Sequence, residues 1–145
     1  VKCIARGGRP LDPVRLIGCE GAMNTQEDTM HEQRPTTRFI AHSKALEAAG
    51  IAISLVLKVP APLKSLADQV IRSASSVPAN LAEGAGRSGR DRNHHYRIAY
   101  SSAQEVDTHL QLLLGADAVN ASRAETATQL FDDVRAMTWR LLHPR

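Results

Sequence analysis

Four segments of this chain carry apolar residues at intervals of three or four, and this pattern constrains the fold more than any other feature. Such spacing puts the apolar side chains on one face of an α-helix. The four stripes are Phe39, His42, Leu46, Ala49, Ile53 and Val56; Leu66, Val70, Ala74, Val77 and Leu81; Tyr96, Ala99, Ala103, Val106, Leu110 and Leu113; and Ala124, Ala127, Phe131, Val134, Thr138 and Leu141. Because no segment alternates as a half-buried strand would, the sequence predicts an all-α protein.

Helix-ending and helix-starting residues separate the four stripes. Two prolines in the segment 59–62 end the first helix, and the second begins near Leu63 and ends at Gly84. Gly115 ends the third helix, and Ser122–Glu125 reads as a capping box that opens the fourth. Since short loops make consecutive helices neighbours, the predicted fold is an antiparallel, up-down-up-down four-helix bundle. An aromatic content of only 3% agrees with closely packed helices of small and aliphatic residues.

The bundle pattern occupies only part of the chain. Residues 1–33 follow neither helical nor strand periodicity, so we expect an irregular or disordered N-terminal tail before a bundle domain over 34–145. Cys3 and Cys19 both fall in this tail, and we expect them to be reduced thiols. The longest apolar run, Ala48–Leu57, is about half of what a membrane span needs. Because no secretory signal is visible either, we expect a cytoplasmic protein.

A proline interrupts the second stripe. Pro78 lies in the helix interior, where proline costs about 3 kcal/mol. We expect it to kink the second helix. Asn80 and Glu83 follow it on a shared surface, and Glu105 flanks the third stripe. We interpret these three polar residues as a buried hydrogen-bonding set that fixes helix register, and the alternative is an acid–base pair of carboxylates.

Sequence signatures of common enzyme classes are missing from the chain. It contains no Walker A loop, no GxSxG and no HExxH motif. Gly84–Gly89 spells GxGxxG, but it follows a predicted helix, whereas a dinucleotide fingerprint follows a strand. His94 and His95 are adjacent and point about 100° apart on a helix, so they do not readily share one metal ion. We therefore predict a non-enzymatic protein with no metal and no cofactor.

Basic residues concentrate where the second and third helices join. Residues 34–145 hold fourteen Lys and Arg against ten Asp and Glu, and the segment 86–97 has four arginines and one acid. Guanidinium groups suit phosphate because they donate hydrogen bonds in pairs. An ordinary charged loop between helices is the alternative. The candidate nucleic-acid-binding residues are Arg87, Arg90, Arg92, His94, His95 and Arg97.

Two segments resemble a known family. LADQVIRSASSVPANLAEGAGR, residues 66–87, resembles the 23S ribosomal RNA intervening-sequence proteins, also called four-helix bundle proteins, and IAYSSAQEVDTHL, residues 98–110, is similar to their third helix. The resemblance covers about residues 36–143 and implies antiparallel bundles that assemble as homopentamers. A relative, the accessory variability determinant of diversity-generating retroelements, is a basic pentamer that binds nucleic acid. For most of the family, the resemblance implies no established biochemical function.

Three hypotheses follow for the function. The first is a non-enzymatic homopentamer that binds RNA or DNA through the basic segment between the second and third helices. The second is a protein-interaction scaffold with no nucleic-acid role. The third is an enzyme that uses Glu83 and Glu105 for acid–base chemistry, and it requires both carboxylates to line one accessible pocket.

Overall fold

The computed structural model describes residues 37–144, and side chains from residue 40. This part of the chain is all-α, as predicted, and contains no strand. None of its helices is long and apolar enough to cross a bilayer. The predicted tail, with Cys3 and Cys19, lies outside the described residues. The elements are α1 (Thr37–Val56), the 3₁₀ helix η1 (Ala61–Leu63), α2 (Lys64–Gly86), α3 (Gly89–Gly115) and α4 (Ala121–Leu142).

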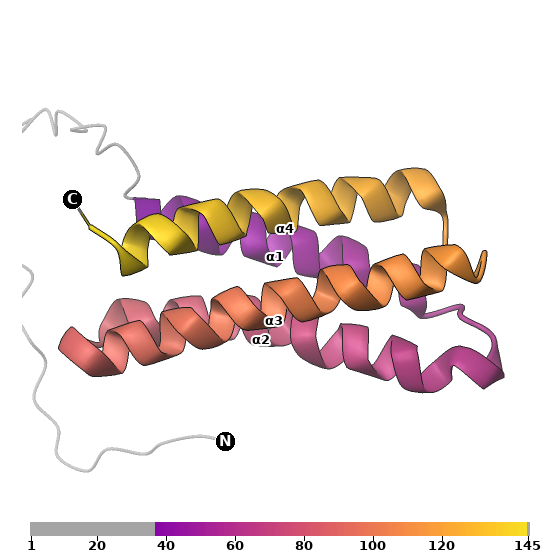
Figure 1. Ribbon diagram of the computed structural model, residues 1–145, viewed down its shortest axis with the longest axis horizontal. Coiled ribbons are helices and arrows are strands. Elements are labelled where there is room, and N and C mark those ends of the chain that lie inside the picture. Colours follow the sequence, from indigo (N-terminus) through magenta and orange to yellow (C-terminus); the bar gives the residue numbers. More distant parts are fainter. Residues whose placement is uncertain (1–36, 145) are drawn as a thin grey trace, which may run out of the picture. The chain divides into compact units, whose positions relative to one another are not determined.

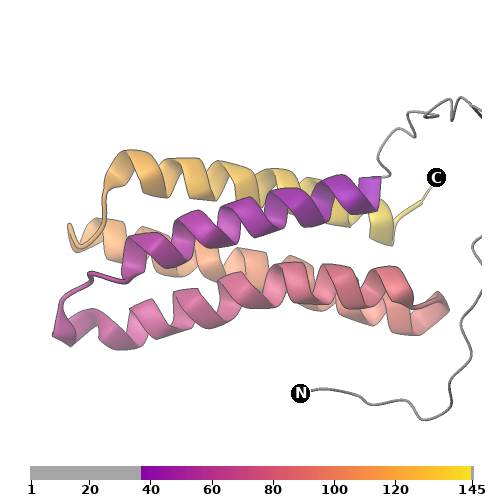
Figure 2. The ribbon, with the colours of Figure 1, turned by 180° about the vertical axis from the view of Figure 1, so that it is seen from behind.

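The four helices pack side by side, with consecutive helices running in opposite directions (Figures 1 and 2). Helix α2 packs on α3, α1 on α4, α1 on α2, and α3 on α4. Figure 1 shows the start of α1, the link between α2 and α3, and the end of α4 at one end of the bundle. The basic segment predicted to bind nucleic acid therefore lies at the same end as the C-terminus of α4.

The predicted stripes of α2, α3 and α4 form most of the core. All six stripe residues of α3 are buried, and so are five of the six on α4, whose Leu141 is half-buried. On α2 the predicted stripe is also buried except for Leu66, and Pro78 and Gly84 join it. Tyr96 and Phe131 are the largest side chains in this core. An amphipathic helix thus shows its buried face in its sequence when polar residues occupy the other faces.

The face of α1 was predicted only in part, because Ala49 and Val56 of its predicted stripe are buried but other members are not. Its core side chains are mostly alanines, which let the helices approach closely, whereas Leu46 is 54% exposed and His42 and Ile53 are only half-buried. The buried residues of α1 are Ala41, Ala45, Ala48, Ala49, Ala52, Leu55 and Val56. Because α1 has apolar residues all around it, periodicity could not single out the face that packs inside the bundle.

Two helix ends also differ from the prediction. Helix α2 continues through Pro78 to Gly86, and Gly84 is a buried packing residue rather than its last. A Cβ atom on Gly84 would lie 2.6 Å from Cε1 and 2.7 Å from Cδ1 of Tyr96, so only glycine leaves room for that ring. The N-cap of α4 is Asn120, two residues before the predicted cap Ser122, because the side chain of Asn120 accepts the hydrogen bond of the Arg123 N–H.

Candidate functional site

The link between α2 and α3 is only two residues long, Arg87 and Ser88. Both have extended backbone, and Gly89 follows with a φ of 56°, a left-handed conformation that suits glycine. The Arg87 N–H donates to the Gly84 carbonyl, 3.3 Å away. This tight turn reverses the chain and sets the start of α3 against the end of α2.

Arg87 is held between two carboxylates. Its Nε donates to Glu83 Oε1 at 2.9 Å, its Nη2 makes an ion pair with the same oxygen, and its Nη1 lies 3.2 Å from Asp91 Oδ2. Hydrogen bonding to Glu83, and then the charges of Glu83 and Asp91, raise the pKa of the Arg87 guanidinium above its usual value. Since two acids already use its donors, Arg87 is not a free phosphate ligand.

Arg90, His94 and Arg97 form a second, exposed group on α3, which we call the basic stripe. Their spacing of four and three places them on one helix face. Within residues 37–144, no carboxylate pairs with any of the three. Arg92 is half-buried, and its backbone carbonyl lies over Gly84. The basic stripe therefore holds the two arginines and the histidine of this segment that are available to a partner.

His95 belongs to a polar network between α2 and α3. Its Nδ1 lies 3.1 Å from Asn80 Oδ1, which only accepts, so Nδ1 carries the proton, and its Nε2 is 3.8 Å from Asp91 Oδ1. Asn80 Nδ2 donates to the Ser76 carbonyl and to the Ser76 hydroxyl oxygen, and the Ser102 hydroxyl donates to that hydroxyl oxygen as well. His95 and Asn80 thus connect the two helices, and His95 is not a free surface cation.

The two glutamates predicted to be buried lie at the surface instead. Glu83 is paired with Arg87, and Glu105 lines a shallow hollow between α2 and α3 together with Arg72. Glu83 does not line that hollow, so the structure does not bring the two carboxylates into one pocket. Asn80 is half-buried and hydrogen-bonded, as a structural residue would be. Among the described residues, no group of three or more His, Cys, Asp or Glu could hold a metal ion.

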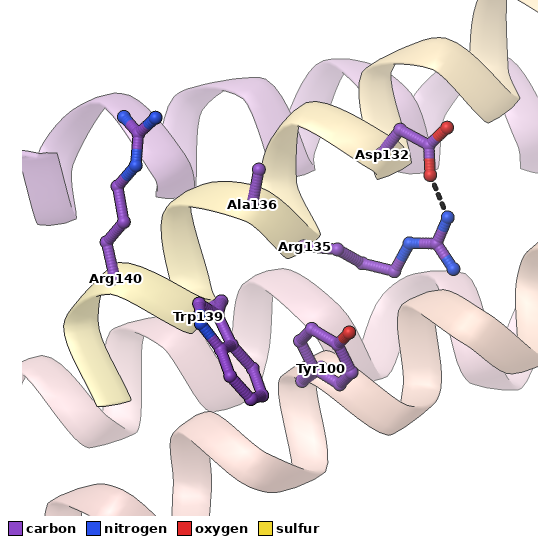
Figure 3. A pocket seen from close by; sticks show the side chains of 6 residues that line it. All are labelled: Tyr100, Asp132, Arg135, Ala136, Trp139 and Arg140. Carbon is purple, nitrogen blue, oxygen red and sulfur yellow. Dashed lines mark hydrogen bonds and ion pairs between the residues drawn. The ribbon is translucent and has the colours of Figure 1, made fainter. Parts of the chain in front are cut away.

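An aromatic cluster missed in the sequence lies between α3 and α4 (Figure 3). The ring centroids of Tyr100 and Trp139 are 6.1 Å apart, and the His143 ring stacks on Trp139 at 3.9 Å and 30°. An open hollow of about 470 Å³ adjoins Tyr100 and Trp139. Its lining residues are Tyr100, Asp132, Arg135, Ala136, Trp139 and Arg140.

Trp139 is the one tryptophan of the chain and is 53% exposed. It directly follows Thr138, one of the buried residues of the α4 stripe, so helical periodicity already placed it outside the core. A large aromatic side chain just off an apolar stripe was the sequence feature that could have indicated an exposed aromatic site. Its partner Tyr100 depends on the packing of α3 against α4, which the sequence alone does not give.

Another hollow, about 460 Å³, is apolar and lies between α1 and α2. We call it the α1–α2 groove. Leu46 and Ile53 of α1 and Pro78 of α2 contribute to it. It is completed by His42, Ala49, Gly50, Ser75, Ala79 and Ala82. The apolar face of α1 that points away from the bundle core therefore borders a groove with almost no charge.

Known proteins resemble this chain in sequence and in fold. Residues 39–140 match the model of a family described as 23S rRNA-intervening sequence protein. Among solved structures, the chain is similar to a protein of unknown function from the S23 ribosomal protein family of Bacteroides thetaiotaomicron VPI-5482. The TM-score is 0.66 at 21% identity, over 73% of this chain and 97% of that one. No curated protein matches the chain.

Proposed function

Because this chain belongs to the 23S rRNA-intervening sequence protein family, we propose that it is a non-enzymatic, oligomeric four-helix bundle that binds nucleic acid. The observation that carries this proposal is the basic stripe of Arg90, His94 and Arg97, exposed and free of carboxylate partners within residues 37–144. Arg87 supports the site indirectly, because its positive charge pairs with Glu83 and Asp91 and offsets part of the negative charge that would repel a phosphate backbone.

A single basic stripe gives weak affinity, since each phosphate contact adds little at physiological salt. Several copies presented together raise the affinity through effective concentration, without any new contact. We therefore propose that the chain assembles with itself, and the family resemblance makes a homopentamer the expected assembly. The α1–α2 groove supports self-assembly, because Leu46 and Ile53 border it and a helix that is apolar all around is normally covered.

Electrophoretic mobility shift at several salt concentrations tests the binding. We expect wild-type protein to shift a single-stranded RNA or DNA at about 50 mM salt, with affinity falling steeply as salt rises. The double variant Arg90→Glu with Arg97→Glu loses that shift, whereas Lys58→Glu, an exposed residue in the segment between α1 and η1, keeps it. An absent wild-type shift at low salt, or equal binding by both variants, contradicts the proposal.

Light scattering tests the assembly separately. We expect a mass about five times the 15.7 kDa of the chain, and a smaller species for Leu46→Glu with Ile53→Glu. The control is Leu112→Glu, because Leu112 has the same 54% exposure as Leu46 but lies outside the groove. A wild-type monomer at micromolar concentration would refute self-assembly.

The alternative is a protein-interaction scaffold, and the same groove favours it, because an apolar groove is suited to a partner helix. In that case the basic stripe is merely solvated. Charge reversal then leaves the partner bound, and the complex survives nuclease treatment.

A further inference from the structure

The indole of Trp139 is exposed, and the proposed role of the basic stripe does not account for this exposure. Large aromatic side chains are normally buried, yet Trp139 is 53% exposed and forms part of the wall of a 470 Å³ hollow. Hollows of this size fall within the range of about 300 to 1,000 Å³ that holds small organic groups. The feature to be explained is a flat apolar surface kept in contact with water.

The indole is held in place by its own helix end. His143 stacks on it at 3.9 Å, and the His143 Nδ1 hydrogen-bonds the Trp139 carbonyl at 3.0 Å. His143 does not line the hollow, so the indole surface facing the hollow is a different one from the surface that His143 covers. A ring fixed in this way loses little conformational freedom when a second flat group stacks on it.

The surroundings of the indole favour an anionic ligand. Arg140 and Arg135 line the same hollow, whose one acid, Asp132, is already paired with Arg135. In Figure 3 the Arg140 side chain extends away from the Trp139 ring, so Arg140 borders the hollow on the side away from the indole. Arg140 has no carboxylate partner within residues 37–144. A flat aromatic group attached to a negative charge therefore matches this hollow better than a neutral apolar side chain does.

The hollow also continues the basic stripe. Arg97 and Tyr100 are three residues apart on α3, which makes them neighbours on the helix surface. Tyr100 in turn meets Trp139 across the α3–α4 contact, with ring centroids 6.1 Å apart. A strand whose phosphates follow the stripe would reach the aromatic pair one helical turn later.

We propose that Trp139 and Tyr100 form a stacking platform for an unpaired nucleobase, with Arg140 and Arg97 binding the flanking phosphates. This proposal rests on the proposed nucleic-acid binding, and it specifies that the bound nucleic acid is single-stranded. In a duplex the bases are stacked on one another, so a platform of this kind selects single strands or flipped-out bases. Ribose and deoxyribose strands share this chemistry.

The single tryptophan makes the platform directly observable, because all tryptophan emission of the chain comes from Trp139. The probes are an oligouridylate and an oligothymidylate of about ten nucleotides, an abasic strand with the same phosphates, and a duplex. We expect saturable quenching of the emission by both base-bearing strands, and none by the abasic strand or the duplex. A difference in affinity between the two base-bearing strands would show whether the protein prefers RNA or DNA.

Variants separate stacking from charge. We expect Trp139→Ala to weaken mobility-shift binding of the base-bearing strands by about 5- to 150-fold. Trp139→Phe retains most of the affinity, because it keeps an aromatic face. The control Leu112→Ala, equally exposed on α3, leaves binding unchanged.

The outcomes distinguish this proposal from the more general one. If the strands shift in the gel but Trp139 emission and Trp139→Ala show no effect, the platform is refuted while nucleic-acid binding stands. If no strand binds, both are refuted. An indole already shielded from acrylamide in the free protein would also overturn the platform, because it would mean that another copy of the chain covers Trp139.

Discussion

The contact between Gly84 and Tyr96 gives the sharpest prediction about stability. Gly84→Ala would place a Cβ atom 2.6 and 2.7 Å from two ring carbons of Tyr96 and 3.3 Å from the Arg92 carbonyl oxygen. Carbon atoms pack at about 3.5 to 4.0 Å, so the ring or the backbone must shift. Tyr96 is 1% exposed and the other neighbour is backbone, so neither can move away easily.

Two opposing effects set the magnitude. Overpacking a core costs about 1–3 kcal/mol, and a contact this short against a buried ring points to the upper end, about 2–3 kcal/mol. Replacing a helical glycine with alanine stabilises the helix by up to about 1 kcal/mol, because alanine has the higher helix propensity. We expect Gly84→Ala to lower the free energy of unfolding by about 1–2 kcal/mol.

Gly86→Ala is the matched control on the same helix, because nothing lies within 4 Å of a Cβ atom there. It should be neutral or slightly stabilising. Urea unfolding at one fixed protein concentration measures both variants, and the midpoint of Gly84→Ala should fall by an amount on the order of 1 M. Equal urea midpoints for the two variants would refute this reasoning, because they would show that the contact with Tyr96 does not require glycine at position 84.

Three further predictions concern α2, the link and the first half of α3. Arg97→Ala should reduce the slope of log affinity against log salt by about 0.7–0.9, whereas Arg87→Ala should change it little, because Glu83 and Asp91 already occupy the Arg87 guanidinium. Asn80→Ala should cost about 1–2 kcal/mol in urea unfolding, since His95 loses a hydrogen-bond partner. Pro78→Ala should keep the bundle folded with a straighter α2, as a crystal structure of the variant would reveal.

The helical stripes show which parts of this fold a sequence determines. On α3 every predicted core residue is buried, because charged and polar residues fill its other faces. On α1 the same method chose Leu46 over Ala45, although Ala45 is fully buried. Residue hydrophobicity favours the larger side chain, whereas close helix packing favours the smaller one. Periodicity fails where apolar residues surround a helix.

The candidate site was predicted in outline only. Glu83, Arg87 and Asp91 are each four residues apart, but the link between α2 and α3 interrupts the helix there, so the sequence did not reveal their pairing. Because Glu83 and Asp91 pair with Arg87, they leave Arg90 and Arg97 available to bind phosphate. The contact of Tyr100 with Trp139 is tertiary and joins residues of two helices, which no local pattern encodes.

Photo-cross-linking tests the central claim most directly. A labelled single strand is irradiated with the wild-type protein, and mass spectrometry then identifies the modified peptides. We predict cross-links within residues 90–100 of α3 and at Trp139 of α4, and their loss in Arg90→Glu with Arg97→Glu. Cross-links confined to the α1–α2 groove, or none at low salt, would contradict nucleic-acid binding through α3 and α4.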